Sequence, residues 1–248
     1  MLSGLGFGQT RYSSFMTSTY SREDALAGWS RLHGGIDPAS SVWIRGWVRL
    51  AHVCASPLIR AGVSPSAATV LGVLVTVSVP LIALAGAAWP LLALVFVLVG
   101  AVLDGVDGAI ALRTGTASRW GRVLDPFADR CSDLLLILTL VILGAPVWLG
   151  VGLAVTTLML ESVRANAQAA GMEGPGALTW WERPSRVIVT SLAAASSGIV
   201  WCARQLGVSV LPWIDGASLA TLYTIAAALL ALVGLVHLLV AVHLQLRR

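Results

Sequence analysis

Six long runs of apolar residues follow one another between residue 66 and residue 245 of the chain. They cover residues 66–87, 89–112, 122–143, 146–170, 184–204 and 216–245. Each run is near or above the roughly 20 residues that a helix needs to cross the hydrocarbon core of a bilayer. The pattern therefore predicts an all-α integral membrane protein with six transmembrane helices.

A different pattern precedes the first run. When residues 39–60 are drawn as a helix at about 100° per residue, apolar and aromatic positions fall on one side and basic positions on the other. The apolar side carries Trp43, Ile44, Trp47, Val48 and Ala51, and the basic side carries Arg45, Arg49 and His52. This arrangement is typical of an amphipathic helix that lies in the headgroup plane. A helix packed on protein is the alternative, but the apolar run that follows at once favours the membrane interface.

Residues 1–38 are rich in serine, threonine and glycine and contain no apolar run of seven residues. A secretory signal peptide needs such a run, so we expect none here. The chain is thus expected to have three parts: a disordered tail at 1–38, a juxtamembrane helix at 39–60 and a membrane domain at 61–248.

Composition agrees with a membrane protein. Hydrophobic residues make up 57% of the 248 residues and charged residues 11%, whereas a soluble domain carries about 25% charge. All sixteen basic residues are arginines and the net charge is +4, but no basic stripe is interleaved with aromatic residues, so no nucleic acid is expected. Three widely spaced cysteines exclude a disulfide scaffold or a zinc ribbon.

The arginines are concentrated in alternate loops. The turns near 87–89 and 144–147 hold no charge. The other connections and the chain end hold Arg60, Arg113, Arg119, Arg122, Arg183, Arg186, Arg247 and Arg248. By the positive-inside rule, we expect both termini and the arginine-rich loops on the cytoplasmic side of the plasma membrane.

Five of the twelve acidic residues lie within thirty positions: Asp104, Asp107, Asp125, Asp129 and Asp133. A carboxylate at membrane depth is unfavourable by at least a few kcal/mol, so such a cluster indicates a functional site. Asp104 and Asp107 are spaced i,i+3 and share a helix face. Asp125 and Asp129, spaced i,i+4, share another. Because a short hairpin joins the two spans, the two faces are expected to converge near their cytoplasmic ends.

Four carboxylates around one point repel one another unless cations lie among them. Oxygen ligands without histidine or cysteine favour Mg²⁺ or Mn²⁺, and we expect two ions at Asp104, Asp107, Asp125 and Asp129. Neighbouring small residues would clear space for a ligand: Gly105, Gly108, Ala111, Gly115 and Gly121. The alternative is a network of ion pairs with the nearby arginines. Asp133, one turn deeper, either joins the site or only orients Arg130.

The stretch AVLDGVDGAIALRTGTASRWGRVLDPFADR contains DxxDGxxA followed by GxxxDxxxD. It resembles the signature of the CDP-alcohol phosphotransferase (CDP-alcohol phosphatidyltransferase) family, DxxDGxxAR and then GxxxDxxxD, and the likeness extends over residues 57–204. Leu112 stands where the family has arginine, and Arg113 follows one residue later. Earlier, SPSAATVLG is similar to the family's Pro-Asn-x-x-Thr, with Ser66 in place of the asparagine.

Two further stretches, ESVRANAQAAG and WWERPSR, are similar to the phosphatidylinositol-phosphate synthase branch of that family. Arg164 stands where the branch has lysine, and Asn166 and Gln168 replace its arginine and glutamate. We expect Arg164, Arg183 and Arg186 to bind an anionic acceptor, with inositol phosphate the first candidate and glycerol phosphate the second. The alternative is that these arginines only satisfy the positive-inside rule.

The resemblance implies transfer of a phosphatidyl group from a CDP-linked lipid, such as CDP-diacylglycerol, to a polar alcohol, with release of CMP, in phospholipid biosynthesis. It implies that Asp104, Asp107 and Asp125 bind metal, and that Asp129 faces the metals and acts as general base. It also implies contacts with the CDP-lipid from Ser66, Thr69, Gly108, Ala111, Ser118 and Gly121, and Arg113 is expected to replace the missing family arginine in part.

Two other kinds of membrane protein also use buried carboxylates, an ion-coupled transporter and a prenyltransferase. An ion-coupled transporter buries carboxylates but usually spreads them over several helices. A magnesium-dependent intramembrane prenyltransferase binds a lipid diphosphate but does not require the glycine and alanine spacing seen here. Release of CMP from CDP-diacylglycerol would distinguish phosphatidyl transfer from both of these functions. Expected partners are the CDP-linked lipid, the acceptor alcohol and membrane lipids, and a homodimer is left open.

Overall fold

The computed structural model describes residues 42–172, 174, 176–208 and 214–247, and their regular elements are seven helices with no strand. The helices are α2 (Val42–Arg60), α3 (Pro65–Ala83), α4 (Trp89–Thr114), α5 (Gly121–Ile142), α6 (Val147–Ala169), α7 (Arg183–Gln205) and α8 (Gly216–Leu246). The expected tail at 1–38 lies outside the described residues. The prediction of an all-helical membrane protein is confirmed, and the helix predicted at 39–60 is described from residue 42 onward.

Local sequence signals set several helix ends. Ser64 caps α3 by accepting a hydrogen bond from the backbone nitrogen of Ala67 at 3.2 Å, and Pro65 occupies the first turn, where its missing N–H is not needed. α4 ends at Gly115, which adopts φ +65° in the left-handed region. Asp215 caps α8 through the backbone nitrogen of Ser218 at 2.6 Å.

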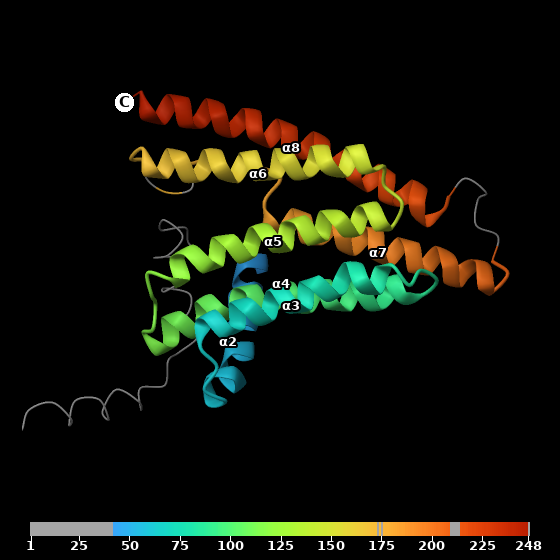
Figure 1. Ribbon diagram of the computed structural model, residues 1–248, viewed down its shortest axis with the longest axis horizontal. Helices are drawn as coiled ribbons and strands as arrows, with labels where there is room; N and C mark the ends of the chain where they lie inside the picture. Colours follow the sequence, from blue (N-terminus) through green and yellow to red (C-terminus); the bar gives the residue numbers. More distant parts are fainter. Residues whose placement is uncertain (1–41, 173, 175, 209–213, 248) are drawn as a thin grey trace, which may run out of the picture.

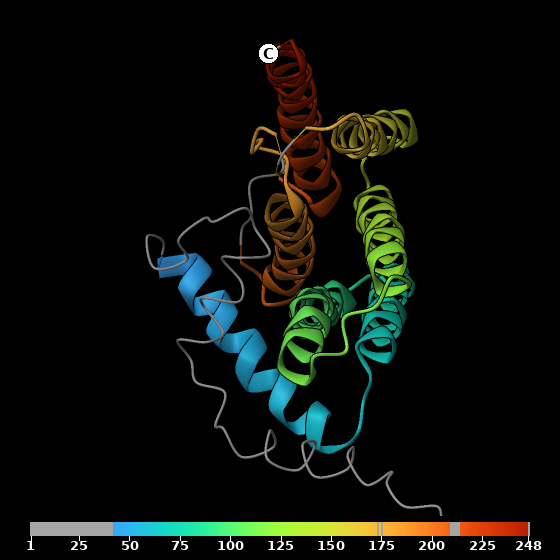
Figure 2. The same ribbon diagram turned by 90° about the vertical axis from the view of Figure 1, so that its left-hand side faces the viewer.

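Helices α3 to α8 run alongside one another, whereas α2 lies across them (Figure 1). Figure 2 looks nearly along the six helices and shows α2, in blue, crossing beside their ends. α7 is central, because it packs on α4, α5 and α8. α3 packs on α4 and α5, and α6 packs on α5 and α8. The site helices α4 and α5 are therefore joined through both α3 and α7.

Five helices are long and apolar enough to cross a membrane: α3, α4, α6, α7 and α8. The chain is therefore a multi-pass membrane protein. α5 has sufficient length but carries five charged residues among its first thirteen: Arg122, Asp125, Asp129, Arg130 and Asp133. The predicted sixth span coincides with this helix and stays a prediction.

α2 is fixed to α4 by a small apolar cluster. Ala51 and Ala55 of α2 are buried against Val106 and Ile110 of α4. A Cβ atom at Gly105 would lie 3.1 Å from Nε1 of Trp47, so the glycine allows α2 to approach α4 closely. Gly105 was expected to clear space for a ligand. Instead it contacts α2.

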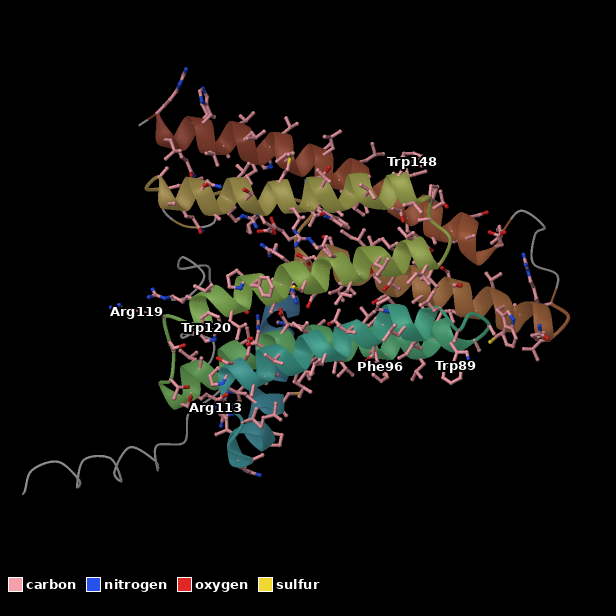
Figure 3. All side chains as sticks on the ribbon, viewed as in Figure 1. Trp89, Phe96, Arg113, Arg119, Trp120 and Trp148 are labelled. Carbon is pink, nitrogen blue, oxygen red and sulfur yellow. The ribbon has the colours of Figure 1, made fainter. Side chains whose placement is uncertain are left out.

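The arginine-rich connections lie at one end of the bundle. The α4–α5 connection and the ends of α6 and α8 are on the left in Figure 1, and the two turns without charge, α3–α4 and α5–α6, are on the right. Figure 3 places Arg119 and Trp120 at the first end and Trp89 and Trp148 toward the second. The predicted orientation depends on this placement of the arginine-rich loops at one end of the bundle and the uncharged turns at the other. Which end faces the cytoplasm stays a prediction.

Candidate active site

The acidic faces of α4 and α5 converge as the spacing predicted. One carboxylate oxygen from each of Asp104, Asp125 and Asp129 lies within 4.8 Å of the others. Asp125 is exposed, and Asp104 and Asp129 are half-buried. Three hard oxygen donors at this spacing, one of them open to solvent, fit a divalent cation such as Mg²⁺ or Mn²⁺.

Asp107 lies beside this group in a more enclosed setting. The hydroxyl of Thr69, on α3, donates a hydrogen bond of 2.5 Å to Oδ2 of Asp107. The backbone nitrogen of Gly108 donates to Oδ1 at 2.6 Å. Both residues were expected to contact the CDP-lipid. In the structure they also fix the orientation of a predicted metal ligand, and a Cβ at Gly108 would meet no atom within 4 Å, so this side of α4 is open.

The first residue of α7 joins the two acidic helices. Nη2 of Arg183 lies 2.7 Å from Oδ1 of Asp104 on α4, and Nη1 donates to Oδ1 of Asp129 on α5. Arg183 is held there by the segment before α7, in which Trp181 is fully buried and donates from Nε1 to the hydroxyl of Thr157 at 2.8 Å.

A second ion-pair network lies next to the acidic group. Arg186 is 1% exposed and donates to Oδ2 of Asp133 at 2.5 Å and to Oε1 of Glu161 at 2.8 Å. Arg130 lies 3.4 Å from Asp133 and 3.3 Å from Glu161. The prediction left open whether Asp133 joins the metal site or orients Arg130. In the structure it pairs with both arginines, and its shorter contact is with Arg186.

Arg164 completes this network on α6. Its Nη2 lies 2.7 Å from Oε1 of Glu182, its Nη1 lies 3.2 Å from Oε2 of Glu182, and Nη1 also contacts Glu161 at 3.2 Å. Glu182 accepts two further hydrogen bonds of 2.8 Å, from the backbone nitrogen and the hydroxyl of Thr179. Burial acts to raise the pKa of Glu182, but the hydrogen bonds from Arg164 and Thr179 hold the pKa below its ordinary value of 4.5.

All three arginines predicted for the acceptor are therefore paired with carboxylates. The sequence interpretation did not single out two of the acids concerned, Glu161 and Glu182. A signal for Glu161 was present, because an acid inside an apolar run and three residues before an arginine indicates a buried ion pair.

The other predicted site residues lie on α3, on the last turn of α4 or close to the start of α5. The hydroxyl of Ser118 accepts from the backbone nitrogen of Gly121 at 2.9 Å and so stabilises the entry to α5. Nη1 of Arg113 donates to the carbonyl of His52 at 3.1 Å and to the hydroxyl of Ser56 at 2.8 Å, so its guanidinium contacts α2. Figure 3 shows Arg113 at this end of the bundle. Ser66 and Ala111 are half-buried.

The chain is similar in sequence to one family of membrane enzymes. Residues 63–246 match the family model described as CDP-alcohol phosphatidyltransferase. The phosphatidylinositol phosphate synthase of Mycobacterium marinum is 28% identical over 187 residues, which are 68% of this chain and 74% of that protein. The synthase of the same name from Mycobacteroides abscessus is 32% identical over 61% of this chain and 71% of its own length. Archaetidylinositol phosphate synthase of Pyrococcus horikoshii is 31% identical over 62% of this chain and 79% of its own.

Solved structures share the fold. Mycobacterium tuberculosis phosphatidylinositol phosphate synthase (PgsA1) in complex with manganese and citrate superposes with a TM-score of 0.62 at 24% identity, over 78% of this chain and 88% of that one. The same enzyme with CDP-DAG bound also gives a TM-score of 0.62 at 24% identity, over 78% of this chain and 94% of its own.

Proposed function

The chain belongs to the CDP-alcohol phosphatidyltransferase family and is a transferase of phospholipid biosynthesis, and we propose that its acceptor is an anionic alcohol. In this reaction an oxygen of the acceptor bonds to the lipid phosphorus of CDP-diacylglycerol, the bond to CMP breaks, and CMP leaves. The convergence of Asp104, Asp125 and Asp129 from two helices supports a cation-dependent transfer, and Arg183 beside this group supports an anionic acceptor.

We propose that Asp104, Asp107, Asp125 and Asp129 hold two ions of Mg²⁺ or Mn²⁺. The oxygen-only donor set supports this, as does the manganese in the PgsA1 complex. Bound cations would neutralise the diphosphate and stabilise CMP as the leaving group. Asp129 is proposed as the general base that accepts the proton of the attacking hydroxyl, since its carboxylate is half-buried and faces the group.

The proposed CDP-lipid pocket lies along the open side of α4 and at the start of α5. It is formed by Ser66, Thr69, Gly108, Ala111, Ser118 and Gly121. Gly108 is exposed, and a Cβ there would meet no side chain or neighbouring helix of the described residues within 4 Å, which supports this location. Arg113 is proposed to act through α2, whose position beside the pocket it fixes by its bonds to His52 and Ser56.

For the acceptor we propose inositol phosphate first and glycerol phosphate second. The names of the relatives support the first. Arg183, which contacts Asp104 of the acidic group, supports an anionic acceptor in general, and Arg164 and Arg186 lie in the neighbouring ion-pair network.

The active site and both termini are proposed to face the cytoplasm at the plasma membrane. In this arrangement α5 is a sixth span, and a second copy of the chain is a proposed partner.

The test is product identification with purified protein. CDP-diacylglycerol and Mg²⁺ or Mn²⁺ would be supplied with inositol phosphate, glycerol phosphate, inositol, serine or phosphatidylglycerol, and CMP release and lipid mass would be measured. We expect CMP and a phosphatidyl product with inositol phosphate, and no CMP in EDTA. Turnover with an uncharged alcohol alone would show that the anionic acceptor is wrong. No CMP with any acceptor would contradict the proposed reaction and leave the prenyltransferase and the transporter to be tested.

One substitution tests the general base. Asp129→Asn is expected to lower the rate of CMP release at least about 10²-fold, because a positioned base contributes that much to proton transfer. Asp215→Asn is the matched control: Asp215 caps α8 at the other end of the bundle, and asparagine caps a helix equally well. Full activity in Asp129→Asn would remove this residue from the mechanism.

A further inference from the structure

The three arginines predicted to bind the acceptor differ in the acids that they contact. A fourth arginine, Arg130, lies 3.7 Å from Oδ2 of Asp129 and 3.4 Å from Asp133. Arg164 is bonded to Glu161 and Glu182, and Arg186 to Asp133 and Glu161. None of these three acids belongs to the group of carboxylates that fits a divalent cation. A cation bound by that group would leave the partners of Arg164 and Arg186 in place.

Arg183 is different. Both of its partners, Asp104 and Asp129, are members of that group. The bond from Nη2 to Oδ1 of Asp104 is 2.7 Å, so the guanidinium uses carboxylate oxygens that are also candidate metal ligands. A guanidinium is a donor only and carries a full positive charge, so its close approach to these oxygens opposes coordination of a divalent cation by the same atoms.

The position of Arg183 gives its side chain room to move. Arg183 is the first residue of α7 and its side chain is 24% exposed, whereas that of Arg186 is 1% exposed. A displaced Arg183 guanidinium can therefore turn toward the open end of the site, and Arg186 has no such freedom.

We propose that a divalent cation and the Arg183 guanidinium compete for Asp104 and Asp129, so that binding of the cation releases Arg183 to bind the anionic group of the acceptor. This rests on the proposed function, which supplies the cation and the anionic acceptor. The two binding events are then coupled: the cation prepares the anion site, and by thermodynamic reciprocity an anion on Arg183 strengthens binding of the cation. Arg164 and Arg186 are positioning residues that hold the ends of α6 and α7.

The reactivity of single arginines tests the release directly. Purified wild-type protein would be treated with phenylglyoxal with and without Mn²⁺, and modification at each arginine would be followed by mass spectrometry of chymotryptic peptides. We expect saturating Mn²⁺ to raise the modification rate of Arg183 about fivefold or more, a typical coupling between two sites. The rates of Arg164 and Arg186 should not change, and exposed Arg119 gives the reference rate.

Binding of Mn²⁺ would be measured by electron paramagnetic resonance on the same samples. This measurement tests the proposed cation site separately from the release of Arg183. Absence of bound Mn²⁺ would overturn both. Bound Mn²⁺ with no rise in Arg183 reactivity would overturn only the release.

A variant supplies the second measurement. Arg183→Gln is expected to bind Mn²⁺ about tenfold more tightly than wild type, because no guanidinium has to be displaced. Arg164→Gln also removes one positive charge near the site, but its partners are not metal-ligand candidates, so its Mn²⁺ affinity should match wild type. Equal tightening in both variants would indicate charge repulsion without competition and would overturn the proposal.

Discussion

Among single residues, Asp107 shows most clearly how the fold orients the side chain of a proposed metal ligand. It is 6% exposed, and it accepts hydrogen bonds from Thr69 on the neighbouring helix α3 and from Gly108 on its own helix. Partners of this kind hold a metal ligand in one orientation, and their loss typically lowers metal affinity.

Thr69→Val removes the donor to Asp107 and keeps the shape of the side chain. We expect the affinity for Mn²⁺ to fall about 10- to 100-fold, as for other partners of metal ligands. Thr76→Val is the matched control, because Thr76 is buried on the same helix and bonds only the carbonyl of Gly72. If Mn²⁺ affinity were unchanged and the KM for CDP-diacylglycerol alone rose, Thr69 would be a substrate contact and not a support for Asp107.

The sequence predicted the acids of the site and, as one alternative, the pairing of Asp133 with Arg130, but not the partners of Arg183. The helix face that Asp125 shares with Asp129 follows from helix periodicity, which is local and regular, and the short connection between α4 and α5 places Asp104 near them. The contact between Arg183 and Asp129 spans 54 positions and depends on how α7 is placed between α4 and α5. Arg113 was likewise expected to turn toward the site, and the structure shows its guanidinium bonded to His52 and Ser56 of α2, a contact between helices that are far apart in sequence.

At the scale of elements, the attachment of α2 to α4 is the feature most open to test. Arg113→Ala removes two hydrogen bonds between the helices and is expected to destabilise the fold by about 1–3 kcal/mol, because the donor is charged. Amide hydrogen exchange should rise in α2 and little elsewhere. Ser56→Ala removes one of the two acceptors of Arg113 and the bond that Ser56 itself donates to the carbonyl of His52 within α2, and it should give a smaller effect of the same kind. A higher KM for CDP-lipid with unchanged exchange in α2 would instead support a direct contact of Arg113 with the substrate.

The turn between α5 and α6 is a second test at this scale. Gly144 has φ +122°, and a Cβ there would lie 2.4 Å from Cβ and 2.6 Å from Cα of Ala217 at the start of α8. Gly144→Ala is therefore expected to destabilise the protein by at least about 1–3 kcal/mol, the range for overpacking, measured by thermal unfolding in detergent. A Cβ at Gly152, within α6, would meet no atom within 4 Å, so Gly152→Ala should be neutral or slightly stabilising. Similar losses in both variants would contradict the packing argument.

At the scale of the whole molecule, the network through Glu182 makes stability depend on pH. The folded pKa of Glu182 lies below 4.5, so this carboxylate stabilises the fold fully above pH 4.5, and the contribution is lost as pH falls from 4.5 through the folded pKa. The difference in Tm between wild type and Glu182→Gln should therefore be constant between pH 5 and 7 and shrink below pH 4.5. A difference that grew on acidification would show that the assigned direction is wrong.

The apolar runs predicted the number and order of helices in the membrane domain, and most of their ends to within one residue. The run at 89–112 ends two residues before α4 does. The run at 66–87 departs most, because α3 ends at Ala83 and the chain turns through Gly86 and Ala87, both with positive φ. Apolar residues continue through this turn, so hydrophobicity alone does not locate it. Nor does it decide whether α5 is a span, since the charges of that helix are balanced by residues of α6 and α7.

The charges of α5 are paired with residues of α6 and α7, and this pairing affects how the protein is inserted into the membrane. Glu161 and Arg186 reach α5 from later parts of the chain, and Arg186 follows Asp133 by 53 positions. During synthesis α5 leaves the ribosome before these partners exist. Each acid or arginine near the middle of an unpartnered helix makes insertion less favourable by about 2.5–3.5 kcal/mol. As the proposed sixth span, α5 therefore gains a stable place in the bilayer only after α7 has been translated, and the order in which the helices are synthesised differs from the order in which they become fixed in the membrane.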